Sequence, residues 1–183
     1  MNQKKWEEIK NKLEGSFQFI HRNLDNFKIK EKVDEMGING YINYCAALAG
    51  ITGATAGLGG GVTMLIGLPA DLLNTVAQQF RVTLAVIYHR TGRYKLSFSE
   101  FMKIAGLSLG VEVGFKGINY ITIRVAEEIG KRLLARGFGR AIPLVGGLVG
   151  LGLNVAFIKS IGSALLAMED SIFIETKQIV SGT

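Results

Sequence analysis

The residues from 45 to 70 form a run of 26 positions without a charged side chain. Small residues recur in and around this run at every fourth position: Ala49, Gly53, Gly57 and Gly61. On an α-helix that spacing places them in one stripe, where a second helix can approach closely. Each interior glycine disfavours a helix by about 1 kcal/mol relative to alanine, so close packing must offset it. The run therefore predicts one long or two short buried helices between residues 41 and 67.

The same spacing returns twice further along the chain. The second and third stripes consist of Gly106, Gly110 and Gly114, and of Gly146, Gly150 and Asn154. Glycine is abundant, with 24 residues, whereas the 183 residues contain only two prolines. This combination favours packed helices over a disordered chain. We expect an all-α protein, a single helical bundle with long glycine-striped apolar helices.

The first 36 residues predict an amphipathic helix. Its apolar positions recur at steps of three or four: Trp6, Ile9, Leu13, Phe17, Ile20, Leu24 and Phe27. Such a face either docks onto the protein core or lies in a membrane interface with Trp6 and Phe17 inserted. Gly37 and Gly40 predict a break after it. We therefore divide the chain into an N-terminal segment, 1–36, and a helical domain, 37–183.

Two stretches approach the length that crosses a bilayer. Residues 45–70 and 141–158 are uncharged, and a membrane helix needs about 20 apolar residues. A helix buried on all sides of a soluble bundle has the same pattern. A transmembrane hairpin made of residues 45–67 and 141–163 therefore stays an alternative to a bundle that associates with the membrane surface.

The net charge of +6 is concentrated in the middle of the chain. Residues 45–140 hold eleven Lys and Arg against five Asp and Glu. A basic region beside apolar stretches suits an anionic lipid surface. Nucleic-acid binding is not expected, because no dense basic run with interleaved aromatic residues is present.

The opening residues lack the apolar core of a secretory signal, and Cys45 is the single cysteine, so we expect a cytoplasmic, reducing location and a buried thiol.

A helix is predicted to start at Leu68-Pro69-Ala70-Asp71 and to stop at Thr91-Gly92. Proline suits the first helical position, and glycine the position after the last. Polar residues gather on one side of this helix: Asp71, Asn74, Gln78, Arg81 and His89. That side is either a solvated face or a site that turns inward.

In the second interpretation Asp71 and Arg81 bind a polar partner, such as a lipid headgroup or the amide of Asn154. Asn154 is the polar exception in an apolar run, and a buried amide requires hydrogen-bond partners. The candidate ligand-binding cluster is Asp71, Gln79, Arg81 and Asn154. A capping box at Ser97-Phe98-Ser99-Glu100 predicts the start of the next helix.

The sequence offers no recognisable catalytic machinery. The two histidines, His21 and His89, are far apart and have no cysteine or carboxylate at metal-ligand spacing. Neither a nucleophile elbow nor a His-Glu-x-x-His motif is present. We therefore predict no cofactor, no metal and no catalytic residue. An enzyme of unknown chemistry that uses Asp71 and Arg81 stays an alternative.

Three groups of motif residues resemble the EcsC family of bacterial proteins. They are Gly57 to Gly61; Pro69, Ala70, Asp71, Gln79 and Arg81; and Pro143, Gly146, Gly150, Asn154 and Phe157. The match covers roughly residues 30–170 and departs at Tyr88-His89, where the family has Tyr-Gly. The resemblance implies a bacterial, all-helical protein on the cytoplasmic side of the membrane. It also implies an ABC transporter as a partner, because the family is named for a protein encoded beside one that is linked to secretion.

Together these observations predict a membrane-associated helical protein that binds lipid or a membrane-protein partner, in membrane remodelling or as a transporter or secretion accessory. Two further alternatives stay open beside the enzyme. One is a soluble carrier of a hydrophobic ligand held between the striped helices, and the other is an integral two-span protein. The sequence predicts no oligomeric state.

Overall fold

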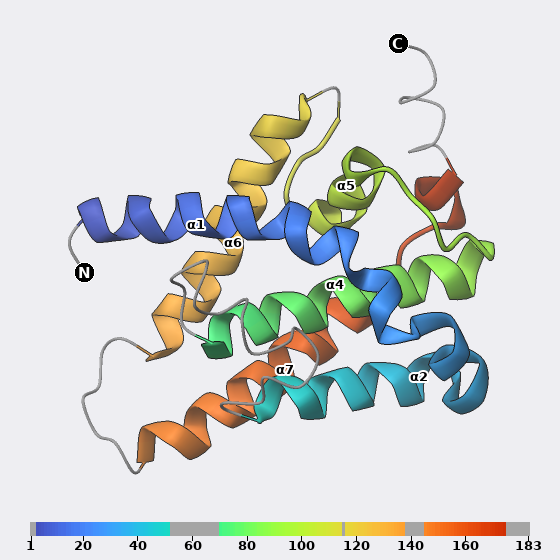
Figure 1. The fold of residues 1–183 in the computed structure, drawn as a ribbon, viewed down its shortest axis with the longest axis horizontal. Helices are drawn as coiled ribbons and strands as arrows, with labels where there is room; N and C mark the ends of the chain where they lie inside the picture. Colours follow the sequence, from blue (N-terminus) through green and yellow to red (C-terminus); the bar gives the residue numbers. More distant parts are fainter. Residues whose placement is uncertain (1–2, 52–69, 115, 138–144, 175–183) are drawn as a thin grey trace.

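The computed structural model describes residues 3–51, 70–114, 116–137 and 145–174. Its elements in chain order are α1 (Gln3–Arg22), the 3-10 helix η1 (Leu24–Phe27), α2 (Ile29–Gly50), α4 (Ala70–Thr91), α5 (Phe98–Ser108), α6 (Ile118–Gly137) and α7 (Val145–Leu166) (Figure 1). The described part contains no strand. The predicted all-α class is therefore confirmed.

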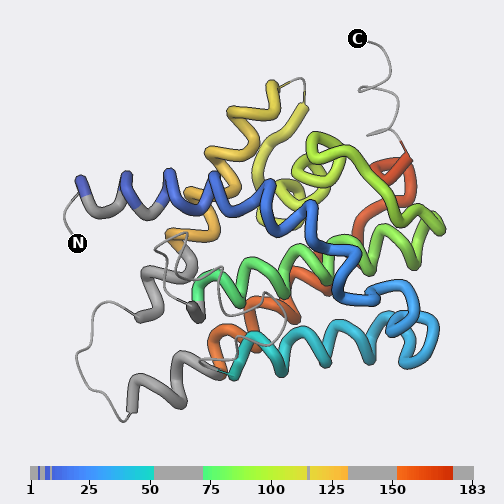
Figure 2. Tube along the Cα trace, in the orientation of Figure 1, coloured from blue at the N-terminus to red at the C-terminus, as the bar shows by residue number. Residues whose placement is uncertain are grey.

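Helix α4 is the centre of the molecule. Every residue from 72 to 87 is buried, so this helix has no solvated face over four turns. Helices α2 and α7 pack along one side of it and against each other, while α1 crosses on the other side (Figure 1). The chain path in Figure 2 shows that α4 and α7 run in the same direction and α2 in the opposite one.

The ends of α4 and the start of α5 agree with the sequence signals. Helix α4 begins at Ala70 and ends at Thr91, and the next residue, Gly92, has φ +67°. Glycine adopts positive φ without steric cost, which explains why the helix stops here. At α5 the capping box forms as predicted: the Ser97 hydroxyl accepts a hydrogen bond from the Glu100 amide, and the Glu100 carboxylate accepts one from the Ser97 amide.

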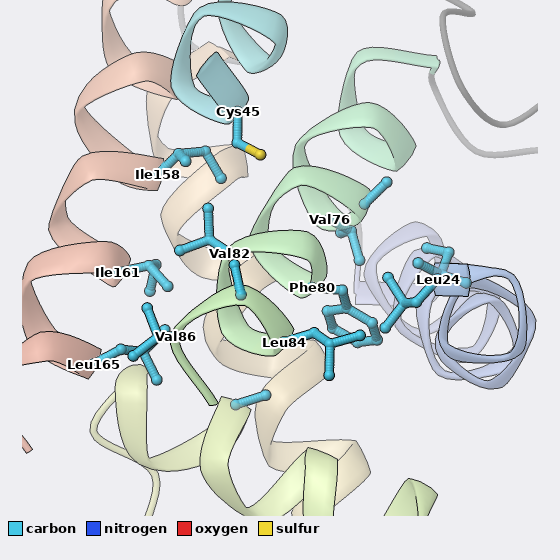
Figure 3. Close-up of a cluster of buried hydrophobic side chains, with 14 of the residues drawn as sticks. Leu24, Cys45, Val76, Phe80, Val82, Leu84, Val86, Ile158, Ile161 and Leu165 are labelled. Atoms are coloured by element: carbon cyan, nitrogen blue, oxygen red, sulfur yellow. The ribbon is translucent and has the colours of Figure 1, made fainter. Parts of the chain in front are cut away.

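Apolar side chains of α4 fill both of its sides (Figure 3). Towards α7 lie Val82 and Val86, which face Ile158, Ile161 and Leu165. On the other side Phe80 packs against Phe17 of α1, with 5.3 Å between ring centres, and against Phe101 of α5 at 4.9 Å. These contacts place α1 in the same core as the rest of the chain.

The membrane interpretation of Phe17 is therefore wrong, because that ring is fully buried against Phe80. The side chain of Trp6, the other predicted membrane contact, lies outside the described part. The predicted single helix over residues 2–36 is also wrong. It ends at Arg22, where a turn rich in Asn and Asp precedes Lys28 in the left-handed conformation, φ +49°. Asn and Asp favour such turns because their side chains bond to nearby backbone, as Asn23 does to the Phe19 carbonyl at 2.8 Å.

The boundary placed between residues 36 and 37 lies inside α2. Gly37 has φ +72° and kinks the helix there, which agrees with the predicted break, whereas Gly40 continues the helix. Since residues on both sides of the kink contribute to one hydrophobic core, the N-terminal segment is part of the bundle and not a separate layer.

The first glycine stripe begins at Ala49, which is buried near the end of α2. A single helix from 41 to 67 is wrong, because α2 ends at Gly50 and Ile51 is extended, φ −84° and ψ 105°. The three glycines of this stripe lie outside the described residues: Gly53, Gly57 and Gly61. The predicted packing of that stripe stays a prediction.

The second stripe does not exist as a helical face. Gly106 is buried in α5, but the helix ends at Ser108, and Gly110 and Gly114 have φ of +78° and +27°. Gly110 forms the left-handed end of a Schellman motif, in which the Val111 amide bonds to the Gly106 carbonyl and the Gly110 amide to the Leu107 carbonyl. The same spacing therefore has a different origin: Gly110 terminates the helix.

The third stripe lies on helical backbone, since Gly146, Gly150 and Asn154 all belong to α7. Helix α7 also approaches α2 closely at another glycine, Gly162. A methyl group at this position would lie 2.8 Å from Cγ2 of Ile42. No helix in the described ranges is both long and apolar enough to cross a bilayer.

Candidate anion site beside helix α4

Arg81 is a buried cation at the centre of the fold. Its side chain is 2% exposed, although a guanidinium stays charged at every physiological pH. Arg81 Nε donates to the Tyr41 hydroxyl at 3.1 Å, and Nη1 donates to Oε1 of Gln78 at 2.7 Å. Arg81 turns inward, as one of the two interpretations predicted. The solvated polar face is wrong for Asn74, Gln78 and Arg81, and right for His89, which is exposed.

The hydrogen bonds continue from Arg81 to the end of α2. Gln78 Nε2 donates to Asn74 Oδ1 at 2.9 Å, and Asn74 Nδ2 donates to the backbone carbonyl of Leu48 at 2.8 Å. Leu48 lies in the last turn of α2, and its carbonyl also accepts a hydrogen bond from the Ile51 amide at 3.3 Å. The Asn74 amide is thus a second donor to this carbonyl, and the chain of polar groups joins α4 to α2.

Aromatic rings surround the guanidinium. Its Cζ lies 4.7 Å from the ring centre of Phe27, 5.7 Å from that of Tyr41 and 5.4 Å from that of Tyr44. Such cation–π contacts stabilise a desolvated cation. None of the ion pairs found in the described residues includes Arg81. The described groups that contact its positive charge are therefore neutral.

A second cation lies at the outer edge of this cluster. Lys32 Nζ donates to the Tyr44 hydroxyl at 2.9 Å and lies 4.4 Å from the Tyr44 ring centre. Both side chains are half-buried, so this edge reaches solvent. Because the Tyr44 oxygen accepts a hydrogen bond from Lys32, its own proton is available for donation to a ligand. We call Arg81, Tyr41, Tyr44 and Lys32 the Arg81 site.

The pKa values of the two tyrosines in the site shift in opposite directions. The hydrogen bond from Lys32 lowers the pKa of Tyr44, because it stabilises the ionised form. Burial raises the pKa of Tyr41 well above its usual value. Burial also raises the pKa of the neighbouring Cys45 thiol to about 11, so this residue is the buried, protonated thiol that its lone occurrence predicted.

The predicted four-residue cluster does not form one site. Gln79 is buried but lies on the opposite side of α4 from Arg81, and Asn154 is half-buried on α7. The Arg81 side-chain donors given above bond to Tyr41 and Gln78 and not to Asn154. The side chain of Asp71 lies outside the described part. Of the three members whose side chains are described, Gln79 and Asn154 therefore lie outside the Arg81 site.

Sequence reasoning missed Lys32, Tyr41 and Tyr44. The spacing Tyr41–Tyr44 places both rings on one side of α2, next to a lysine three turns earlier, and this pattern was the available signal.

Within the part of the chain that the structure describes, no group of acidic, His and Cys side chains could hold a metal ion. His21 is half-buried beside Phe98 and Phe101, and burial lowers its pKa.

Comparisons with protein-family models, with curated proteins and with solved structures found no match. The resemblance to the EcsC family therefore stays a prediction that depends on the motifs quoted above.

Proposed function

We propose that this protein binds the anionic headgroup of a membrane lipid at the Arg81 site, at the cytoplasmic face of a bacterial membrane. The observation that carries the proposal is the buried Arg81 guanidinium, which forms no ion pair among the described residues and shares the Tyr44 ring with a second cation, Lys32.

The electrostatics of the cluster favour an anion at its outer edge. Moving a cation out of water is costly, and among the described residues neutral oxygens and rings, not a carboxylate, contact the Arg81 charge. A positive potential therefore remains, and it is stronger in a buried setting than in bulk water. A phosphate or carboxylate at the edge would accept hydrogen bonds from the Lys32 ammonium and the Tyr44 hydroxyl, which suits charge-assisted binding.

Two features of the whole chain favour a lipid as the source of this anion. The basic excess lies in residues 45–140, and it would be attracted to an anionic leaflet. The EcsC resemblance also implies a location on the cytoplasmic side of a membrane and a membrane-protein partner such as an ABC transporter. Membrane remodelling and support of a transporter are the roles that such binding would serve.

Vesicle sedimentation tests the proposal. The wild-type protein should sediment with vesicles of phosphatidylcholine and phosphatidylglycerol, and not with phosphatidylcholine alone. Lys32→Gln should weaken this binding about tenfold, since a hydrogen bond to a charged group contributes about 1.5 kcal/mol. Lys30→Gln is the matched control, because Lys30 is exposed on the same helix and does not touch the site, and it should change binding less than twofold.

Equal losses in the two variants would contradict a specific site and leave only diffuse electrostatic attraction. A second measurement separates lipid from free anion. If inorganic phosphate raises the melting temperature of the protein but vesicles do not bind, the ligand is a soluble phosphate compound and the lipid proposal fails.

A further inference from the structure

Gln79 has a buried amide that no group among the described residues satisfies. Its side chain is fully buried, and neither Nε2 nor Oε1 has a hydrogen-bond partner in that part of the chain. An amide carries two donors and an acceptor oxygen, and buried polar groups in native proteins are almost always paired. The missing partner is therefore an observation that points to a bound group.

The position of Gln79 follows from the helix period. It precedes Val82 and Val86 by three and seven residues, which places it on their stripe of α4. Figure 3 shows these valines facing Ile158 and Ile161 of α7. Helices α4 and α7 run in the same direction (Figure 2). By the helix period, Gln79 therefore extends the stripe of Val82 and Val86 towards the N-terminal ends of both helices.

Towards its N-terminal end, helix α7 changes from aliphatic side chains to an amide and glycines. Its stripe through Ile161 and Ile158 continues to Asn154, Gly150 and Gly146, at steps of three or four residues. The isoleucines are thus followed by an amide and then by residues without side chains. Asn154 is half-buried, so the seam reaches the surface near it.

We propose that the N-terminal half of the α4–α7 seam binds an uncharged amphiphile, a long-chain alcohol or monoacylglycerol, whose hydroxyl group bonds to the Gln79 amide. The amide matches a neutral group that both donates and accepts. Apolar neighbours such as Val82 and Ile158 suit its alkyl chain. This site is separate from the Arg81 site, since residues two apart on a helix point to nearly opposite sides.

A pair of probes tests the hydroxyl requirement. n-Decanol and n-decane have the same chain length, and only the first has a hydroxyl group. After delipidation, n-decanol should raise the melting temperature of the wild-type protein by several degrees, and n-decane should not. Gln79→Met, which keeps a similar shape without the amide, should abolish the n-decanol shift while circular dichroism shows an unchanged fold.

The ligand-free variant gives a second, independent readout. Gln79→Met should melt at or above the wild-type temperature, because it removes an unpaired buried amide. A clearly lower melting temperature would show that Gln79 has a partner within the chain and would overturn the proposal. An n-decanol shift that is absent in the wild type, or equal in both proteins, would also overturn it.

Discussion

Two neighbouring glutamines on opposite flanks of α4, Gln78 and Gln79, differ in whether their buried amides are hydrogen-bonded. On the side of α2, Gln78 lies in an unbroken series of hydrogen bonds from Arg81 to Leu48. On the side of α7, Gln79 is equally buried and its amide has no partner among the described residues. The difference comes from the helix that packs opposite. Helix α2 presents the Tyr41 hydroxyl and the Leu48 carbonyl, whereas the stripe of α7 consists of aliphatic side chains followed by Asn154 and glycines.

The largest effect is expected from replacing Arg81, which joins Tyr41 of α2 to Gln78 of α4. Arg81→Met should lower the free energy of unfolding by about 3 kcal/mol, because it leaves buried oxygens of Tyr41 and Gln78 without their donor. Chemical denaturation measures this change. Arg81→Lys keeps the charge but not the geometry, so it should lose less. A loss below about 1 kcal/mol in Arg81→Met would mean that the network contributes little to stability.

The second prediction concerns alkaline pH. Burial raises the pKa of the Cys45 thiol from its ordinary value of 9.0 to about 11 in the folded protein. Between these values the unfolded chain has released the proton and the folded chain keeps it, so stability is complete below pH 9 and falls as pH rises to 11. The slope should be about 1.4 kcal/mol per pH unit from this group alone.

The comparison of Cys45→Ala with the wild type isolates that contribution. Denaturant titrations at several alkaline pH values should give a shallower slope for the variant, whatever its stability at neutral pH. Tyr41 adds to the slope in both proteins, because burial raises its pKa too. Parallel slopes would contradict a buried, protonated Cys45.

The third prediction compares the neighbouring glutamines directly. Gln78→Met should lower the free energy of unfolding by about 2 kcal/mol, because it leaves a buried Arg81 donor and the Asn74 acceptor unpaired. Gln79→Met should not lower it in the ligand-free protein. Since both substitutions bury a similar side chain on the same helix, each serves as the control for the other. Equal losses would show that the two sides are alike.

The smallest effect on stability is expected at the edge of the Arg81 site. Tyr44 is half-buried, so Tyr44→Phe should change the free energy of unfolding by less than about 1 kcal/mol. It should also remove the phenol that titrates early, since Lys32 lowers the pKa of Tyr44. Ultraviolet titration of tyrosinate measures this; loss of a late-titrating phenol instead would contradict the assignment.

Helix boundaries that carry a local signal were predictable from the sequence, whereas the ends of α1, α2 and α5 were not. Pro69 and Gly92 bracket α4, and the Ser97 capping box starts α5, as predicted. These signals act through residues within one turn of each other, so they do not depend on the remainder of the fold. The same applies to the kink at Gly37.

The interpretation of spacing was less reliable. Gly106 and Gly110 have the separation of a helical stripe, yet Gly110 is the left-handed end of α5. Phe17 is spaced like an interfacial anchor, yet it packs against Phe80. Periodicity shows that residues share a face, but only the neighbouring elements decide whether that face contacts protein, lipid or water.

By itself, the sequence determined an all-helical chain and a helix that stops before Gly92. Tertiary structure alone decided that Arg81 is buried, because the Tyr41 hydroxyl that receives its hydrogen bond lies 40 positions away in sequence on α2. It also decided that Gln79 has no partner in the described ranges where Gln78 has two. Local signals are set by backbone conformation over a few residues, whereas the environment of a polar side chain is set by the helix that packs against it.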